Sequence, residues 1–314
     1  MIRLYIVVPC YNEEAVLPET TRRLSGILSQ MSDDGLVTED SRVVYVNDGS
    51  SDKTWEMTEK FFRQSSNVCG VKLARNAGHQ NALMAGLTTV HDMADAFVTI
   101  DADLQDDIMA IPEMVRKLSE GNDIVYGVRN ERKTDTLFKK STALLFYRLM
   151  EALGVKTIYN HADFRLMSRR AVEQLLEYKE RNLFLRGIVP LIGYRTAQVY
   201  YNRDKRFAGE SKYPLMKMLN FAIDGITSFS VKPVRLVFTL GLVFIAVSLL
   251  ILVWVIHAYL TKNVVPGWAS LMLSIWLVGG CVLVGLGVVG EYVGKIYTEV
   301  KARPRFNIEE TLLK

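Results

Sequence analysis

The chain has 314 residues, of which 49% are hydrophobic and 23% charged, and this ordinary globular composition excludes extensive disorder. Its length allows about two domains of roughly 150 residues each. The net charge of +4 is too small to indicate a nucleic-acid partner, and the three cysteines lack the spacing of a disulfide scaffold or a zinc ribbon.

Apolar, β-branched runs alternate with helical patterns in the first part of the chain. Strands separated by helices of 10 to 18 residues predict an α/β fold with a mainly parallel sheet. The predicted strands lie at 4–8, 42–46, 71–73, 96–100 and 123–126, and the predicted helices lie at 13–30, from an N-cap at Ser51 to 62, and at 80–90.

Four polar clusters each follow one of these strands. They read PCYNEE (9–14), NDGSSD (47–52), ARNAGHQ (74–80) and DADLQDD (101–107). Because the carboxyl ends of parallel strands meet at one edge of a sheet, and ligands bind there, we expect the four clusters to form one ligand site.

Two carboxylates in the fourth cluster carry the clearest chemistry. Asp101 and Asp103 stand two residues apart just past a buried strand, and Gln105 offers a third oxygen. Oxygen ligands of this kind suit Mg²⁺ or Mn²⁺, with the phosphates of a substrate completing the coordination shell. The alternative is an Asp-rich loop that caps a helix, and we expect Asp106 and Asp107 to cap the next helix or to stay in solvent.

The second cluster is first of all a turn signal. Within it, Asp48 is placed to accept a hydrogen bond from a nucleobase N–H group or a ribose hydroxyl.

Two long stretches without charge follow, at residues 236–256 and 268–290. The first has 21 residues and is about 31 Å long as a helix, which matches a hydrocarbon core of about 30 Å. The connector at 261–267 is short, so the two stretches predict a transmembrane hairpin.

The flanking residues predict the orientation of this hairpin. Residues 203–235 hold seven basic and three acidic side chains, so the positive-inside rule places the domain before the hairpin, and both termini, in the cytoplasm. Residues 214–230 predict interfacial amphipathic helices, with an ordinary surface helix as the alternative. The predicted organisation is a catalytic domain at 1–212, interfacial helices at 213–234, two transmembrane helices within 235–294 (about 236–260 and 268–292), and a cytoplasmic tail at 295–314.

Several motifs together resemble a known family. VVPCYNEE, VNDGSSDKT and DADLQDD resemble the inverting family-two glycosyltransferases, and five further segments narrow the resemblance: DFRLMSRR, RNLFLRG, AGESKY, ITSFSVKPVR and GEYVGKIY. Together they resemble the bacterial polyprenyl-phosphate glycosyltransferases, the bactoprenol glucosyltransferase branch related to dolichol-phosphate mannose synthase. The resemblance covers nearly the whole chain and is not specific for the sugar.

The resemblance implies a GT-A fold and a metal-dependent, inverting transfer of one sugar from a nucleotide sugar to undecaprenyl phosphate. UDP-glucose is the first candidate donor and UDP-N-acetylglucosamine the second. It also implies a multi-pass protein of the bacterial cytoplasmic membrane, a homo-oligomer (dimer or tetramer) and a role in building a cell-wall polymer, O-antigen or other surface glycan. In two places the chain departs from the family: Asp107 stands where relatives commonly have Pro, and His79 where they often have Lys.

The same resemblance implies roles for individual residues. Pro9, Tyr11, Glu13, Asp48, Asp101 and Ala102 would bind the nucleotide sugar, and Asp101, Asp103 and Gln105 the metal. Asp103 and Asp163 would be catalytic, Asp163 either orienting the acceptor phosphate or acting as a base. Basic side chains must hold that phosphate against the donor diphosphate, and the candidates are Arg129, Arg206, Ser211 and Lys212.

Three other functions compete with this one. A processive polysaccharide synthase needs more spans and a Q-x-x-R-W motif, and a transporter needs titratable residues within its spans, features that this sequence lacks. The third is an inactive membrane adaptor that binds a nucleotide sugar, against which the intact Asp101, Asp103 and Glu13 argue.

Overall fold

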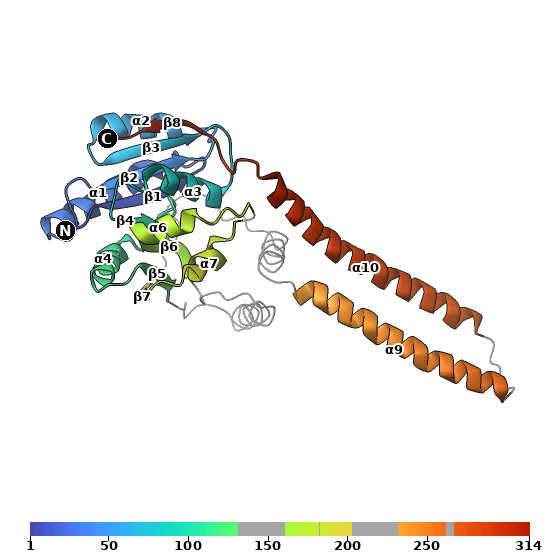
Figure 1. The fold of residues 1–314 in the computed structure, drawn as a ribbon. Helices are drawn as coiled ribbons and strands as arrows, with labels where there is room; N and C mark the ends of the chain where they lie inside the picture. Colours follow the sequence, from blue (N-terminus) through green and yellow to red (C-terminus); the bar gives the residue numbers. More distant parts are fainter. Residues whose placement is uncertain (131–160, 182, 203–231, 262–266) are drawn as a thin grey trace. The chain divides into compact units, whose positions relative to one another are not determined.

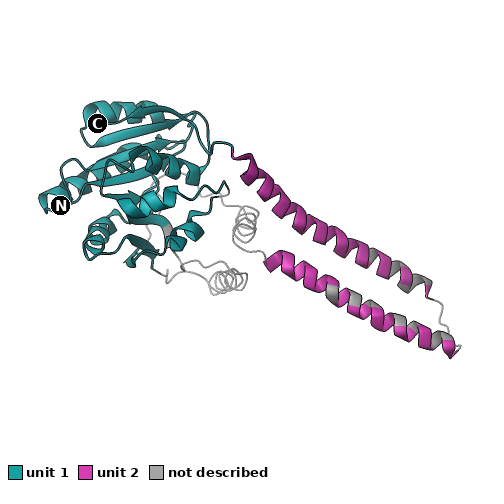
Figure 2. Ribbon diagram, in the orientation of Figure 1, with its two compact units in different colours: residues 1–147, 156–214, 303–314 teal, residues 148–155, 215–302 magenta. Residues whose placement is uncertain are grey.

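The computed structural model describes residues 1–130, 161–181, 183–202, 232–261 and 267–314. The chain divides into two compact units (Figure 2): residues 1–147, 156–214 and 303–314 form the first, and residues 148–155 and 215–302 form the second. The predicted interfacial helices fall almost entirely within 203–231, outside the described residues.

A single mixed sheet forms the centre of the first unit (Figure 1), and its strand order in the described residues is β7-β5-β6-β4-β1-β2-β3-β8. The strands are β1 (Leu4–Cys10), β2 (Arg42–Asn47), β3 (Val68–Leu73), β4 (Ala96–Thr99), β5 (Ile124–Arg129), β6 (His161–Ser168), β7 (Thr196–Tyr201) and β8 (Ile308–Leu312). Strands β1 to β4 pair in parallel, as predicted, and so do β5 and β7. The predicted α/β fold with a mainly parallel sheet is confirmed.

Helices cover both faces of the sheet. They are α1 (Leu17–Asp33), α2 (Thr54–Gln64), α3 (His79–Val90), α4 (Ile111–Ser119), α6 (Arg169–Leu176) and α7 (Leu185–Ile188), with short 3₁₀ turns η1 (Ile108–Ala110) and η2 (Val189–Ile192). Buried residues of α1 and α4 pack in one core cluster with Leu4, Ile6 and Val8 of β1. Side chains alternate along a strand, so Val7 faces the other way, and a Cβ at Gly86 of α3 would lie 2.6 Å from it. Gly86 therefore lets α3 approach the opposite face closely.

Two helix starts differ from the prediction. Helix α1 begins at Leu17 rather than at residue 13, because the preceding glutamates belong to the loop after β1. Ser51 does not cap α2: its hydroxyl donates to Asn12 Oδ1 (3.3 Å), and the backbone N–H of Thr54 donates to Asp52 Oδ1 (3.0 Å) instead.

Strand β6 was not predicted from the sequence, and it sets the geometry of the site. It runs antiparallel between β4 and β5, with Arg165 opposite both Thr99 and Tyr126. Because it is reversed, its first residues lie at the edge where the other strands end. Asp163 is thereby placed beside the loop that follows β4.

The predicted tail contains ordered structure. Residues Ile308–Leu312 form β8, which pairs antiparallel with β3, and Lys72 Nζ lies 3.0 Å from Glu309 Oε1. Arg305 Nη2 also donates to the carbonyl of Tyr178 (2.9 Å). The end of the chain is thus part of the first unit and covers the β3 edge of its sheet.

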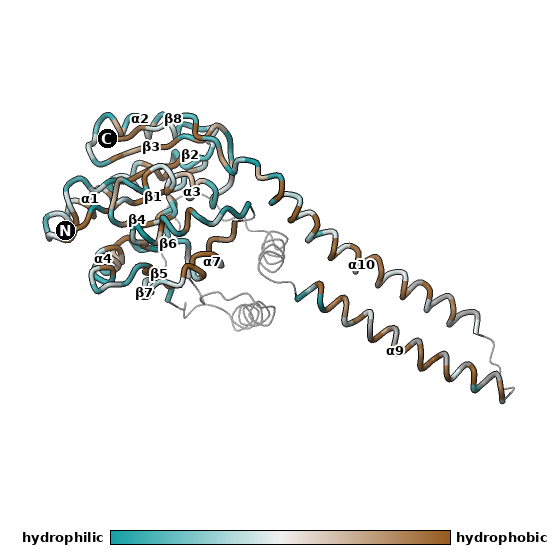
Figure 3. Tube along the Cα trace, viewed as in Figure 1, coloured by the Kyte–Doolittle hydropathy of each residue, from teal (hydrophilic) through white to brown (hydrophobic). Residues whose placement is uncertain are grey.

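The second unit contains two long helices, α9 (Lys232–Leu260) and α10 (Trp268–Lys301), and each includes one of the two uncharged stretches together with charged residues beyond it. Figure 3 shows hydrophobic residues along both helices, and many of their large apolar side chains are exposed. They approach each other at Gly285, where a Cβ would lie 3.1 Å from Val237 Cγ1. Within the described residues, one segment, Leu277–Lys301, is long and apolar enough to cross a membrane, so the predicted two-helix transmembrane hairpin is not confirmed.

Candidate functional site

The four polar clusters meet at the carboxyl edge of the sheet, as predicted. The backbone N–H of Asn12 donates to Ser50 Oγ (3.0 Å), which joins the first cluster to the second. The N–H of Ala77 donates to Asp48 Oδ1 (2.6 Å), joining the second to the third. His79 Nε2 then lies 3.4 Å from Asp101 Oδ1, which connects the third cluster to the fourth.

The first two loops hold each other through side-chain acceptors. The N–H of Glu13 donates to Thr54 Oγ1 (2.9 Å), and the N–H of Lys53 donates to Glu14 Oε2 (3.0 Å). Asn12 has a φ of 55°, which turns the chain sharply after β1. Of the predicted nucleotide-binding residues here, Pro9 is buried in β1, Glu13 is half-buried, and Tyr11 is 50% exposed at the rim.

Asp48 holds the third loop in place. Its carboxylate is buried and accepts from the N–H groups of Ala77 (2.6 Å) and Gly78 (3.0 Å). Burial raises the pKa of Asp48, and these two donors oppose the shift. Gly49 beside it has a φ of +64°, and a Cβ there would lie 2.5 Å from the backbone nitrogen of Asn76, so only glycine fits. Each carboxylate oxygen of Asp48 has two lone pairs, so acceptor capacity remains for a ligand.

The surroundings of Asp101 disfavour its ionised form. Its side chain is 37% exposed, but Oδ1 is buried and forms no hydrogen bond to the part of the chain that the structure describes. Burial raises the pKa of Asp101 to about 6; His79 opposes this, whereas Asp163, Asp106 and Asp103 add to it. A buried oxygen surrounded by like charges favours a cation as its partner.

The rest of the DADLQDD loop forms a tight turn. Asp103 and Gln105 are both 8% exposed, and the N–H of Gln105 donates to Asp103 Oδ1 (3.1 Å). Leu104 between them has a φ of 55°. Ala102 is buried, and its carbonyl accepts from Thr20 Oγ1 (2.9 Å), so the turn is fixed to α1.

This donor set fits a divalent ion that shares its shell with a substrate. Among the described residues, no group of three or more His, Cys, Asp or Glu side chains is arranged to hold a metal by itself. Mg²⁺ and Mn²⁺ take carboxylate oxygens and are often held by one or two carboxylates, with phosphate oxygens supplying further ligands. Asp101 and Asp103 match that requirement.

Asp163 is clamped by two arginines. Arg165 Nη2 donates to its Oδ1 (2.7 Å), and Arg186 Nη2 donates to its Oδ2 (3.1 Å). Burial acts to raise the pKa of Asp163, but Arg186 and Arg165 outweigh it and hold the pKa far below its ordinary range. His79 Nε2 lies 4.0 Å from Asp163 Oδ2, so the same imidazole faces Asp101 and Asp163.

Sequence reasoning gave no site role to Arg165, Arg186 or His79. Arg186 belongs to the RNLFLRG segment, which contributed only to the family resemblance. Arg165 lies two residues after Asp163 on β6, whereas the contacts of Arg186 on α7 and of His79 on α3 with Asp163 depend on tertiary packing.

Asp106 and Arg129 form a pair that the sequence did not indicate. Arg129 Nη2 donates to Asp106 Oδ1 (3.0 Å), and the hydroxyl of Tyr201 donates to the same oxygen (2.6 Å). The prediction that Asp106 caps a helix or stays in solvent is wrong, because Asp106 is buried in this pair. For Asp107 the cap is confirmed: its Oδ1 accepts from the N–H of Met109 (2.9 Å) at the start of η1.

Three of the predicted acceptor-phosphate residues, Arg206, Ser211 and Lys212, lie outside the described residues. The structure therefore places Arg129 alone of that predicted set.

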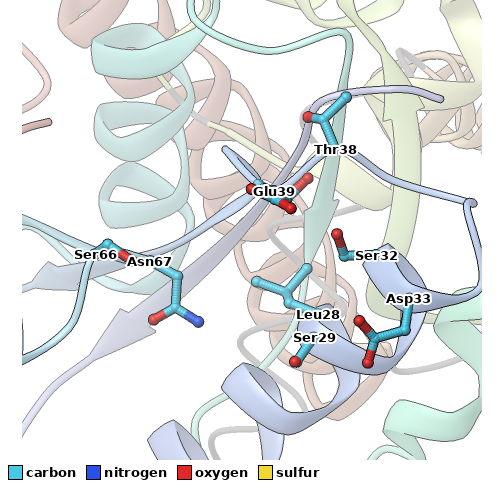
Figure 4. A pocket seen from close by; sticks show the side chains of 9 residues that line it. Leu28, Ser29, Ser32, Asp33, Thr38, Glu39, Ser66 and Asn67 are labelled. Atoms are coloured by element: carbon cyan, nitrogen blue, oxygen red, sulfur yellow. The ribbon is translucent and has the colours of Figure 1, made fainter.

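A polar pocket of about 250 Å³ lies at the opposite edge of the sheet (Figure 4). Its charged lining residues are acidic, Asp33 at the end of α1 and Glu39 before β2. A pocket with this lining is poorly suited to a phosphate-bearing substrate.

The family model for glycosyl transferase family 2 matches residues 5–176. The uncharacterized glycosyltransferase YkoT of Bacillus subtilis (strain 168) is 51% identical over 306 residues, 98% of this chain and 91% of that protein. The bactoprenol glucosyl transferase of Shigella phage SfX is 39% identical over 313 residues, 98% of this chain and 99% of that protein.

Among solved structures, glucosyl-3-phosphoglycerate synthase from Mycobacterium tuberculosis, in complex with Mn²⁺, UDP and phosphoglyceric acid, matches with a TM-score of 0.47 and 20% identity. That match covers 72% of this chain and 76% of the synthase.

Proposed function

Because this chain belongs to glycosyl transferase family 2, we propose that it transfers one sugar from a nucleotide sugar to the phosphate of a membrane polyprenol. One observation carries the proposal: relatives named bactoprenol glucosyl transferase are 39% identical over essentially the full length of both chains. Asp101 and Asp103 at the sheet edge would hold a divalent ion, and that ion would bind the donor diphosphate. UDP-glucose is the proposed donor, and UDP-N-acetylglucosamine is the alternative.

The reaction exchanges one bond for another. The bond between the sugar C1 and the donor phosphate oxygen breaks, and its electron pair leaves with the nucleoside diphosphate. An oxygen of the acceptor phosphate forms the new bond to C1 from the opposite face, which inverts the configuration. The products are a polyprenyl-phosphate sugar and the nucleoside diphosphate.

The donor end of the site is assigned to the first, second and fourth loops. Pro9, Tyr11, Glu13, Asp48 and Ala102 would line the nucleoside and sugar positions, and Asp101, Asp103 and Gln105 would hold Mg²⁺ or Mn²⁺ together with the diphosphate. When bound, such an ion stabilises the negative charge that develops on the leaving diphosphate.

The acceptor places modest demands on acid–base chemistry. A phosphate monoester has a second pKa of about 6, so near neutral pH it is largely a dianion and already a competent nucleophile. Asp163, held ionised by Arg165 and Arg186, is a weak base in this setting. Its two arginines support the other predicted role, which is to orient the acceptor phosphate. Asp163 would do so by holding Arg186, whose side chain is 33% exposed, for contact with that phosphate.

We assign the acceptor phosphate also to Arg206, Ser211 and Lys212, just before the predicted membrane helices. For Arg129, the pairing with Asp106 favours a positioning role over a phosphate contact.

The membrane assignment rests on sequence and helix length. We propose that α9 and α10 anchor the protein in the bacterial cytoplasmic membrane and that the catalytic unit faces the cytoplasm, where nucleotide sugars are made. The basic excess in residues 203–235 supports this orientation. A homo-oligomer, and use of the product in building a surface glycan, belong to the same proposal.

A transfer assay tests the reaction and the sugar together. The full chain in detergent is mixed with undecaprenyl phosphate, MgCl₂ or MnCl₂, and one nucleotide sugar per tube: UDP-glucose, UDP-N-acetylglucosamine, UDP-galactose or GDP-mannose. Mass spectrometry detects the polyprenyl-phosphate monosaccharide, and a coupled assay detects the nucleoside diphosphate.

The outcomes distinguish the donor, the acceptor and the competing adaptor function. A product from UDP-glucose that disappears with EDTA supports the proposal, and a product only from UDP-N-acetylglucosamine selects the alternative donor. Release of nucleoside diphosphate without a lipid product overturns the polyprenyl acceptor. Neither release nor product with any donor favours the inactive, nucleotide-sugar-binding adaptor.

A further inference from the structure

We infer that Arg129 acts as a positioning residue that fixes the DADLQDD loop to the ends of β5 and β7 through Asp106 and Tyr201. These three residues are named the Asp106 lock. The inference rests on the proposed function, because the loop concerned is the one assigned to the donor diphosphate.

The contacts of the lock converge on one carboxylate oxygen. Arg129 Nη2 and Nε donate to Asp106 Oδ1 (3.0 and 3.3 Å), and the hydroxyl of Tyr201 donates to the same atom (2.6 Å). Arg129 Nε also lies 3.2 Å from the Tyr201 hydroxyl oxygen, which closes the triangle. Four charge-assisted contacts among three residues define the position of each side chain.

The three side chains are shielded from water, and their mutual contacts hold them in place. The side chain of Asp106 is 2% exposed and that of Arg129 is 21% exposed. The ring of Tyr201 is also buried and packs edge-on against Phe164, with ring centroids 5.3 Å apart. A buried ion pair is costly to break, because the remaining charge has no water to solvate it.

The position of the lock gives it a consequence for the site. Arg129 and Tyr201 are register partners at the ends of the parallel strands β5 and β7. Asp106 directly follows Gln105 and lies three residues after Asp103, so the lock ties these strand ends to the predicted metal-binding turn. Small displacements of such a turn are expected to reduce metal affinity, because supporting contacts keep the metal-binding oxygens in place.

The same geometry argues against Arg129 as a phosphate ligand. Its charge is already neutralised by Asp106, and two of its three guanidinium nitrogens face the lock. A phosphate would have to compete with a carboxylate for the same cation.

A double-mutant cycle tests the inference on the full chain. Asp106→Ala, Arg129→Ala and the double variant are compared with wild type by two readouts. The first is UDP binding at fixed MnCl₂ measured by calorimetry, and the second is kcat and KM for undecaprenyl phosphate. We expect each single change to weaken Mn²⁺-dependent UDP binding by about 10-fold, the range found for supporting residues at metal sites. Because the two residues act as one unit, the double variant should match the weaker single variant, and the acceptor KM should stay within about twofold.

Two further variants distinguish the loss of the Asp106 lock from a loss of folding. Tyr201→Phe keeps the buried ring and removes one contact, so it should lower UDP affinity by about threefold without loss of folding. Asn130→Ala is the matched control: Asn130 follows Arg129, and its side chain bonds to Asn202 (3.0 Å) outside the lock. It should leave both readouts unchanged.

A different pattern would overturn the inference. A rise in the acceptor KM for Arg129→Ala, with normal UDP binding and a normal Asp106→Ala variant, would make Arg129 a phosphate ligand. Normal UDP binding in Tyr201→Phe would refute the lock even if the alanine variants fail to fold. Since UDP binding does not depend on the acceptor, this test still applies if the transfer assay shows a different acceptor.

Discussion

Two groups of carboxylates lie at the same edge of the sheet, and their partners differ. In the loops after β1 and β2, Glu14, Asp48 and Asp52 accept hydrogen bonds from backbone N–H groups. In and beside the loop after β4, Asp101 and Asp163 lie near one another and near His79. The first group builds the loops, whereas the second group is arranged around charge.

The pKa shifts of one carboxylate from each group illustrate this difference, whereas burial raises the pKa of Asp48 in the first group and two arginines outweigh burial and lower the pKa of Asp163 in the second. For Asp52, burial acts to raise the pKa, but bonds from Thr54 and Glu14 outweigh it, and the pKa falls below its ordinary value. For Asp101, burial and neighbouring carboxylates raise the pKa to about 6. Backbone N–H groups stabilise a carboxylate without adding a full charge, whereas facing carboxylates need a cation. The comparison teaches that the residue type alone does not separate structural carboxylates from ligand-binding ones.

The largest expected effect is on Asp103. Asp103→Ala should lower transfer activity by about 100-fold or more, because loss of a ligand should cost at least as much as loss of a supporting contact. Asp107→Ala is the matched control in the same loop, since Asp107 only caps η1, and its rate should stay within about threefold. Initial rates with saturating donor measure both. Equal losses in the two variants would contradict a ligand role for Asp103.

Asp163 should show the next largest effect. Asp163→Asn leaves the buried guanidinium of Arg165 without its carboxylate, so kcat should fall by about 10- to 100-fold. The pKa of Asp163 lies far below its ordinary range, so this group stays ionised throughout pH 5 to 9 and contributes no acid limb. The residual activity should therefore keep the wild-type pH profile. A lost or displaced acid limb in the variant would show that Asp163 acts as a base.

Asp48 tests the structural group. Asp48→Ala leaves the N–H groups of Ala77 and Gly78 without their acceptor, which should lower the free energy of unfolding by about 1–3 kcal/mol. Urea unfolding of the full chain, followed by tryptophan fluorescence, measures this. A variant with wild-type stability would mean that these two hydrogen bonds do not stabilise the loop.

Asp101 should behave in the opposite way. Asp101→Asn removes one of several facing negative charges, so in EDTA it should raise the free energy of unfolding by less than about 1 kcal/mol, after screening at this partly exposed site. It should also lower metal-dependent transfer, by no more than Asp103→Ala does. Paired unfolding curves in EDTA and in MnCl₂ measure the effect. A loss of stability in EDTA would place Asp101 with the structural carboxylates.

The smallest expected effect is on the stability contributed by Asp123, which lies away from the carboxyl edge of the sheet. Bonds from Arg170 lower the pKa of Asp123, so its stabilising contribution is present above about pH 4 and is lost as the pH falls further. The side chain of Arg170 is 65% exposed, so salt should weaken this contribution. Acid unfolding of Asp123→Asn at low and high salt measures it. Identical acid limbs in wild type and variant at low salt would contradict it.

Much of the architecture was determined by the sequence itself. Local periodicity located the strands β1 to β5 and the long helices α9 and α10, because alternation and apolar length are properties of neighbouring residues. Parallel pairing then required the four polar clusters to meet at one edge. The contacts of Asn12 with Ser50, of Ala77 with Asp48 and of His79 with Asp101 confirm that they do.

Tertiary structure decided the partners of the polar side chains whose contacts join distant parts of the chain. Asp163 reaches the site because β6 inserts in reverse between β4 and β5. Arg129 bonds to Asp106, 23 residues earlier in the chain, and Tyr201 of β7 donates to the same carboxylate oxygen. Such contacts depend on how distant strands order themselves in the sheet, and one residue type serves as a cap, a clamp or a ligand according to the neighbours that packing brings within reach.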